Sequence, residues 1–299
     1  MELLLRGNAA LALASAILWG GGDFSGGAAV KAASGTMRSA FRVVLLSHAV
    51  SLVTLFALSF AWGGARPPNP DLAWGIVAGI LAALSLTTFY VALSGGAMGA
   101  AAALSGLLAA IIPASVSLLT EGLPGTLRLA GFALALLAIW LVAAAPSPHP
   151  ANPASRRSMA LAIAAGIGFG LYFVAMKMAG RGGLLWPMTS VRIGSVATCA
   201  ILVLVTLRLR QPVESSVPSA YLPRRAVLWA IGPALLDTGG NLLFMAATRI
   251  GRLDVASVLA SLYPASTILL AAWIFHERPT RRQGLGMLTA AAAVVMITF

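Results

Sequence analysis

The sequence predicts an all-α polytopic membrane protein, in which ten transmembrane helices form two inverted five-helix repeats. Three observations predict this fold class: the composition, the spacing of the charged residues and an internal repeat. Hydrophobic residues make up 59% of the 299 residues and charged residues only 9%, against about 45–50% and about 25% in ordinary soluble domains. So little charge cannot cover a soluble surface. With a single cysteine, Cys199, the composition also argues against a disulfide scaffold.

The strong positive charge is read as a topology signal. The formal net charge is +12, but the arginines lie between apolar runs and no nucleic-acid motif accompanies them, so we expect no nucleic-acid partner. Assigned to the nearer membrane side, twelve of the 20 Lys and Arg residues share the side opposite the termini and eight share the side of the termini. The positive-inside rule then slightly favours external termini. The first half is nearly balanced, and the orientation stays open.

Ten spans follow from the length of the uncharged intervals. A hydrocarbon core about 30 Å thick needs about 20 apolar residues in a helix. This measure gives spans near residues 8–30, 37–62, 72–94, 98–120, 127–145, 158–178, 187–208, 226–248, 254–275 and 282–298. The runs are continuous and not alternating, which argues against a β-barrel. The first span is expected to be a retained helix and not a signal peptide, because it has only Arg6 before it and recurs later in the chain.

An internal repeat divides the chain into residues 1–150 and 151–299. Residues 11–17 match residues 161–167, and residues 39–43 match residues 189–193, both at an offset of 150. Later matches lie at an offset of 155: Trp74 with Trp229, Phe89 with Phe244, Gly96 with Gly251 and Gly131 with Gly286. Each repeat contains five spans, and an odd number makes the second copy enter the membrane from the opposite side. Inverted repeats with a ligand site at their interface are typical of secondary transporters.

These residues resemble a known family. The resemblance rests on residues 244–247 followed by Gly251, on Pro264 thirteen residues before Glu277, and on residues 276–280 with Gln283 and Gly284. They are similar to the drug/metabolite transporter superfamily, specifically its EamA-type exporters of ten helices, and within it to the amino acid exporters of the YddG kind. The resemblance implies a multi-pass exporter of small metabolites, with amino acids first among them, in a bacterial-type inner membrane and without a cofactor.

Two carboxylates are the first candidates for substrate binding. An ionisable residue at the centre of a span costs about 2.5–3.5 kcal/mol and normally faces a polar cavity or a partner. Asp23 follows three glycines in the first span, and Asp237 lies midway through the eighth, one turn before Asn241. The alternatives are an interfacial position at the end of a short helix for Asp23, and a structural bond to Thr238, Asn241 or an arginine for Asp237.

Aromatic residues within spans complete the predicted site. Six of the seven tryptophans lie near span ends, as an interfacial belt requires. Trp19 lies near the middle of a span, and its N–H, like the hydroxyls of Tyr90, Tyr172 and Tyr263, needs a polar partner at that depth. Core packing is the alternative for each. The predicted substrate-binding set is therefore Trp19, Asp23, Tyr90, Tyr172, Asp237, Asn241 and Tyr263.

Glycines and prolines supply the predicted hinges. Glycine-rich spans can bend or unwind, and proline frees a carbonyl in a helix. The candidates are Gly20, Gly21, Gly22, Pro113, Gly168, Gly170 and Pro264. Arg42 and Arg192 are read as long side chains that reach the membrane interface, and His48 as a hydrogen-bonded packing residue.

Two functions compete. The first is an alternating-access secondary transporter that moves small metabolites outward across the inner membrane, with proton coupling left open. The second is an intramembrane aspartyl protease, because residues 20–23 fit G-x-G-D and a second carboxylate, Asp237, follows Pro233-Ala234-Leu235. The order of its motifs is wrong for that family. The sequence contains no P-loop, H-E-x-x-H or G-x-S-x-G motif of other enzyme classes. Three histidines and one cysteine do not predict a metal site.

Overall fold

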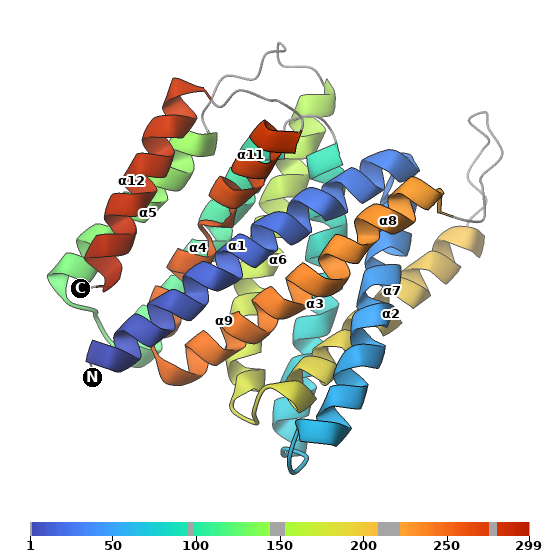
Figure 1. The fold of residues 1–299 in the computed structure, drawn as a ribbon, viewed down its shortest axis with the longest axis horizontal. Coiled ribbons are helices and arrows are strands. Elements are labelled where there is room, and N and C mark those ends of the chain that lie inside the picture. Colours follow the sequence, from blue (N-terminus) through green and yellow to red (C-terminus); the bar gives the residue numbers. More distant parts are fainter. Residues whose placement is uncertain (1, 95–97, 144–152, 209–221, 275–279, 299) are drawn as a thin grey trace.

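Helices form all the regular structure that the computed structural model describes, namely residues 2–94, 98–143, 153–208, 222–274 and 280–298 (Figure 1). In chain order they are α1 (Glu2–Ala33), α2 (Met37–Trp62), α3 (Asn69–Ser94), α4 (Met98–Glu121), α5 (Thr126–Ala143), α6 (Pro153–Gly180), α7 (Leu185–Arg208), α8 (Arg224–Gly232), the π-helical turn η1 (Pro233–Asp237), α9 (Thr238–Ile250), α10 (Leu253–Ala260), α11 (Tyr263–Ile274) and α12 (Arg281–Thr298).

Each of the ten predicted spans coincides with one helix or with helices placed end to end, which confirms the predicted fold class. Within the described residues, seven of these units are long and apolar enough to cross a membrane, and α5 contains a shorter apolar helix. The helices α1 and α12 fall outside both groups. Their polarity has a clear source, since α1 carries Asp23 within a glycine-rich stretch and α12 begins with Arg281 and Arg282.

Two spans of the second half depart from a regular α-helix. The eighth span passes from α8 through the π-helical turn η1 into α9 without a break, and Pro233 stands at the start of that turn. The ninth span ends its first helix at Ala260 and begins its second at Tyr263, next to Pro264. Proline has no N–H to donate and crowds the preceding turn, so both irregularities lie where the sequence weakens the helix. By contrast, α4 runs unbroken through Pro113.

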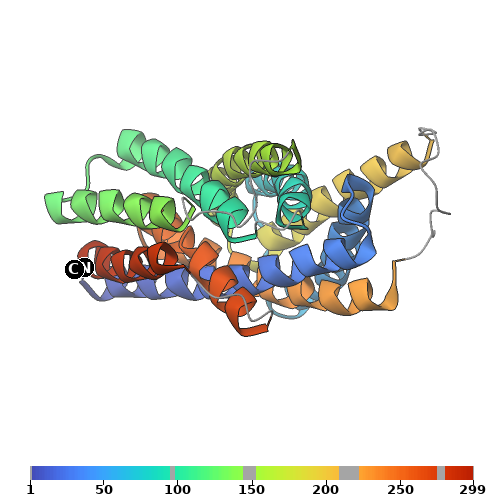
Figure 2. The same ribbon diagram turned by 90° about the horizontal axis from the view of Figure 1, so that it is seen from above.

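Helix packing follows an approximate two-fold pattern. The helix α6 packs along α3 and α4, while its counterpart α1 packs along α8 and α9 on one side and along α10 and α11 on the other. The helix α2 packs on α7, and α5 packs on α12, as Figure 1 shows at opposite sides of the molecule. Figure 2 gives the same arrangement from above, with green α5 facing red α12. The predicted boundary at residues 150 and 151 lies outside the described residues.

The distribution of polarity is that of a membrane protein. Large apolar side chains such as Phe60, Trp62 and Leu119 are 68%, 75% and 86% exposed, which suits contact with lipid tails. Several charged and amide residues instead lie inside, among them Asp23, Asp237, Asn241 and the fully buried Arg192. The interior of this chain therefore holds polar groups that a soluble protein would rarely bury.

Candidate functional site

A buried cavity lies where α1, α3, α6, α9, η1 and α11 meet. Its lining consists of Trp19, Asp23, Ala82, Leu86, Phe169, Tyr172, Phe173, Asp237, Asn241 and Tyr263, and each of these side chains is at most 8% exposed. The cavity volume is about 30 Å³, which is room for about two water molecules, since one needs about 10–15 Å³. A larger solute would need the surrounding helices to move apart.

The lining draws on equivalent positions of the two halves. At the offset of 150, Trp19 corresponds to Phe169 and Asp23 to Phe173; at the offset of 155, Ala82 corresponds to Asp237 and Leu86 to Asn241. Eight of the ten lining residues thus form four pairs. Every pair combines one side chain with a polar group and one that is purely apolar. Equivalent positions therefore supply both halves of the wall, but with different chemistry.

Asp237 is held by a buried ion pair. The fully buried guanidinium of Arg192 donates from Nη2 to Oδ2 of Asp237 at 2.6 Å. Asn241 donates from Nδ2 to the same oxygen at 3.1 Å, and its own carbonyl oxygen accepts a 2.9 Å bond from Trp19 Nε1. This chain of bonds connects α7, η1, α9 and α1 across the cavity wall. The structural alternative for Asp237, a bond to an arginine or to Asn241, is therefore present in the structure.

Arg192 has further partners on α2 and α9. It donates from Nε to Ser51 Oγ at 2.9 Å, from Nη1 to His48 Nε2 at 3.1 Å and from Nη2 to Thr238 Oγ1 at 3.1 Å. His48 Nδ1 is then left to donate to Ser195 Oγ. The prediction that Arg192 reaches the membrane interface is wrong: a guanidinium with this many fixed acceptors is stable inside, because its charge is paired and hydrogen-bonded. His48 is the hydrogen-bonded residue that its position predicts.

Asp23 is the contrasting carboxylate. The helix α1 continues ten residues beyond it, to Ala33, so the alternative of an interfacial position at a helix end does not hold. Among the described residues, no hydrogen-bond or ion-pair partner of the Asp23 carboxylate is present. Nearby, the buried hydroxyl of Tyr172 also has no hydrogen-bond partner. Two polar groups of the cavity wall are therefore available to a ligand.

Aromatic rings form much of the remaining wall. Trp19 stacks on Phe173 with their ring centroids 5.1 Å apart and their planes 8° apart, and Phe244 packs behind both, at 5.4 Å and 4.6 Å. Tyr263 places its ring in the wall, but its hydroxyl pairs with Ser105 Oγ at 2.5 Å. Trp19 and Asp23 are four residues apart, so they lie on the same face of α1.

The structure brings six of the seven predicted binding residues around this one cavity. The exception is Tyr90, which is 1% exposed but not part of the lining. Its ring packs against Gly26 of α1, where an added Cβ would lie 2.2 Å from Tyr90 Cζ. Tyr90 thus packs in the core, which is the alternative that the sequence analysis gives for it.

The predicted hinge glycines serve close helix packing in this conformation. A Cβ at Gly20 would lie 2.4 Å from Ser266 Cβ on α11, and one at Gly168 would lie 2.0 Å from Ser85 Oγ on α3. Gly21 and Gly22 pack on η1, and Gly170 packs on Ile112 of α4. Both α1 and α6 remain regular helices there. These segments are not unwound in this conformation, and their hinge role stays a prediction.

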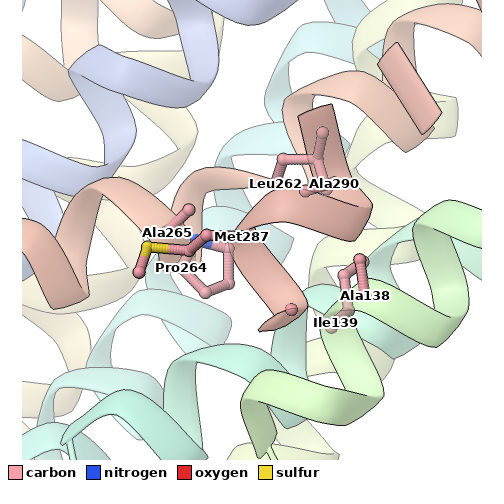
Figure 3. A pocket seen from close by; sticks show the side chains of 8 residues that line it. Ala138, Ile139, Leu262, Pro264, Ala265, Met287 and Ala290 are labelled. Carbon is pink, nitrogen blue, oxygen red and sulfur yellow. The ribbon is translucent and has the colours of Figure 1, made fainter. Parts of the chain in front are cut away.

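A second pocket lies outside this site. It is lined by apolar residues of α5 and α12 together with Leu262, Pro264 and Ala265, and Figure 3 labels Pro264 and Met287 among these residues. Its volume is about 10 Å³, at the lower limit for one water molecule. The side chains that line this pocket are apolar, so it offers no hydrogen-bonding or charged group to a ligand. It surrounds the helix break next to Pro264 with apolar groups.

A polar cluster ties several helix ends together away from the cavity. Glu121, at the end of α4, pairs with Lys177 of α6 and accepts a 3.4 Å bond from the backbone N–H of Leu253. Arg252 pairs with Asp254 at 2.7 Å and donates to the carbonyl oxygens of Glu121 and Gly122. Glu121 is thus an intrachain pairing group. Glu277, one of the residues on which the family resemblance rests, lies outside the described residues.

Sequence reasoning missed four lining residues and the centre of the polar network. Phe169, Phe173, Ala82 and Leu86 are apolar and carry no signal of their own, but adding the repeat offsets to the polar candidates would have found them. Arg192 is the centre of that network, whereas the sequence predicts it at the membrane interface. The signal available was the presence of a buried carboxylate, Asp237, which requires a cation within reach.

Comparisons with known proteins agree with this architecture. A crystal structure described as "Crystal structure of protein" is 18% identical, covers 98% of both chains and has a TM-score of 0.69, which shows the fold. No match is found among curated proteins.

The family comparison matches a transporter family. Residues 156–299 match the model of the EamA-like transporter family. The protease alternative gains no support, because the match is to a transporter family and Asp237 is committed to Arg192. The second half of this multi-pass membrane protein is therefore similar to an EamA-like transporter domain, and this similarity supports the drug/metabolite transporter superfamily.

Proposed function

We propose that this protein is a secondary transporter that exports small metabolites, with amino acids as the first candidates, by alternating access around the central cavity. The match to the EamA-like transporter family supports transport of a small molecule through a bilayer. The observation that carries the proposal is the pairing of lining residues at the repeat offsets. A cavity built from equivalent positions of two inverted halves can open to either side by the same motion.

The substrate-binding residues in this proposal are those that line the cavity and carry a polar group: Trp19, Asp23, Tyr172, Asp237, Asn241 and Tyr263. Asp237 and Asn241 are also bonded within the protein, so they hold the wall in shape as well as lining it. The hinge proposal rests on Pro264, which adjoins an actual helix break. The cavity is too small for an amino acid as it stands, so transport requires that such breaks allow the helices to separate.

Transport into liposomes tests this proposal. Purified protein is reconstituted, the vesicles are loaded with an unlabelled amino acid, and uptake of the labelled form by exchange is measured against protein-free vesicles. A carrier gives saturable exchange with at least one substrate of a broad amino-acid and metabolite panel. Absence of exchange across the whole panel, with folded protein in the vesicles, would sink the proposal.

Proton coupling is tested with the same vesicles. Transport is measured with and without an imposed pH gradient at a fixed membrane potential. A coupled exporter responds to the gradient, and Asp23 is the unpaired acidic group of the wall that would carry the proton. Equal rates in both conditions indicate facilitated diffusion, which leaves the carrier proposal intact.

A further inference from the structure

We propose that the cavity selects amine cations, with Asp23 as the residue that binds the ammonium group and the aromatic wall as the surface that holds the apolar body. This inference deepens the proposed carrier function and rests on it. It predicts that a substrate's ammonium group is required and that its carboxylate is not. A primary amine should therefore be bound at least as well as the corresponding amino acid.

The charge of the wall supports a cation. Two carboxylates line the cavity, but the charge of Asp237 is neutralised by Arg192 at 2.6 Å. Asp23 has no pairing group among the described residues, so it is the acidic group of the wall that a ligand can still pair with. An ionised carboxylate is costly in a low-dielectric interior unless a cation joins it. With no lysine or arginine in the described lining, a ligand that brings its own ammonium group stabilises the ionised form of Asp23.

The donors of Arg192 show why a carboxylate is not recognised. A substrate carboxylate would need a free guanidinium or ammonium group in the wall. Arg192 is the cation nearest in the bonding network, and its Nε, Nη1 and Nη2 already donate to Ser51, His48, Asp237 and Thr238. Its side chain is fully buried behind Asp237. The carboxylate of a zwitterionic amino acid would therefore lie in the cavity without a positively charged partner.

The remaining wall fits the body of a hydrophobic amine. Trp19 and Phe173 form a stacked pair, and Phe169 and Tyr263 add further rings to the lining. Aromatic faces attract cations and offer a large apolar surface at low conformational cost. The unpartnered hydroxyl of Tyr172 gives one more polar atom, which can accept a hydrogen bond from an ammonium group.

Binding measurements on the full-length protein in detergent test this proposal. The probes are 2-phenylethylamine, its uncharged match 2-phenylethanol and its zwitterionic match phenylalanine, and isobutylamine serves as a smaller amine. We expect 2-phenylethylamine to bind at least tenfold more tightly than 2-phenylethanol, and no more weakly than phenylalanine. Equal affinity for the amine and the alcohol, or no binding of either amine, would overturn the proposal.

Two matched variants assign the effect to Asp23. Asp23→Asn should remove the preference for the amine over the alcohol, whereas Asp71→Asn, the same change at the start of α3 outside the cavity, should keep it. The comparison of amine with alcohol on the wild-type protein decides the question even if Asp23→Asn does not fold. Exchange of amino acids by wild-type vesicles, combined with no amine preference, refutes only this inference. Absence of exchange with every member of the amino-acid and metabolite panel, amines included, refutes the proposed function.

Discussion

Asp23 and Asp237 line the same cavity but have opposite surroundings. Asp237 lies in a π-helical turn and receives hydrogen bonds from Arg192 and Asn241. Asp23 lies in a regular helix and has no such partner among the described residues. The difference teaches that depth in the membrane does not by itself make a carboxylate a ligand-binding group. What matters is whether the protein has already satisfied its charge.

The comparison also separates two kinds of stabilisation. The bonds around Asp237 join five helical elements from both halves of the chain, namely α1, α2, α7, η1 and α9, so they stabilise the folded state. Asp23 makes no such connection, so its burial costs folding free energy that no partner in the described structure offsets. Substitutions at the two positions should therefore affect different measurements.

The largest effect is expected from Arg192→Met. This change leaves Asp237 buried without its cation, and breaking a buried ion pair by removing one partner costs about 3–5 kcal/mol. Thermal unfolding in detergent should show a strongly lowered midpoint. The double variant Arg192→Met/Asp237→Leu should recover part of the loss, because it removes the stranded charge as well. An unchanged midpoint in the single variant would show that the ion pair is unimportant.

The two Asp→Asn substitutions should have opposite effects: Asp237→Asn should lower stability, and Asp23→Asn should abolish exchange. Asp237→Asn leaves the Arg192 guanidinium without its carboxylate, and we expect it to lower the unfolding midpoint. Asp23→Asn removes an unpaired carboxylate, so stability should not fall while substrate exchange is lost. Both variants are measured for unfolding and for exchange in liposomes. A destabilised Asp23→Asn with normal exchange would reverse the assignment of the two residues.

Trp19→Phe tests the bond that reaches from α1 to the Asp237 network. It keeps an aromatic ring beside Phe173 but removes the donor to Asn241 Oδ1. Loss of one such hydrogen bond costs about 0.5–1.5 kcal/mol, which should lower the unfolding midpoint moderately. Phe173→Leu serves as the control, since it removes the stacking and leaves the bond. No change in Trp19→Phe would indicate that the bond is not formed.

The smallest effect is expected from Tyr172→Phe. The Tyr172 hydroxyl has no partner in the folded protein, so its removal should leave stability unchanged or slightly raised. If it bonds to a substrate, affinity should fall roughly twofold to tenfold, the equivalent of about 0.5–1.5 kcal/mol. Tyr263→Phe provides the contrast, because the Tyr263 hydroxyl is bonded to Ser105 and its loss should lower stability. Unchanged affinity in Tyr172→Phe would remove it from the site.

Most of the fold could be predicted from the sequence, because charge is scarce and its positions mark the span ends. The span 37–62 coincides with α2, Met37–Trp62. The π-helical turn at Pro233 and the break next to Pro264 were less predictable, since Pro113 lies in a regular α-helix. Which proline interrupts its helix depends on packing by neighbouring helices, and a single sequence does not state that packing.

The polar candidates were predictable and their partners were not. A buried carboxylate or indole N–H is conspicuous in an apolar span, which is how Asp23, Asp237 and Trp19 were found. Arg192 could be read as reaching the membrane surface because its depth and direction depend on how α7 packs against α2 and η1. Tyr90 and Tyr172 have the same residue type and similar depth, yet only Tyr172 faces the cavity. Rotation of a helix about its axis decides between them.

Protection of a cavity position by the transported solute is the most direct test of the central claim, that the cavity between the two halves is the substrate site. Leu86→Cys is made in a Cys199→Ser background, reconstituted and treated with a small thiol reagent, and Gly125→Cys in an exposed loop is the control. The account predicts that a transported solute slows modification of Leu86→Cys and leaves Gly125→Cys unaffected. Equal rates of Leu86→Cys modification with and without a solute that is being transported would contradict it.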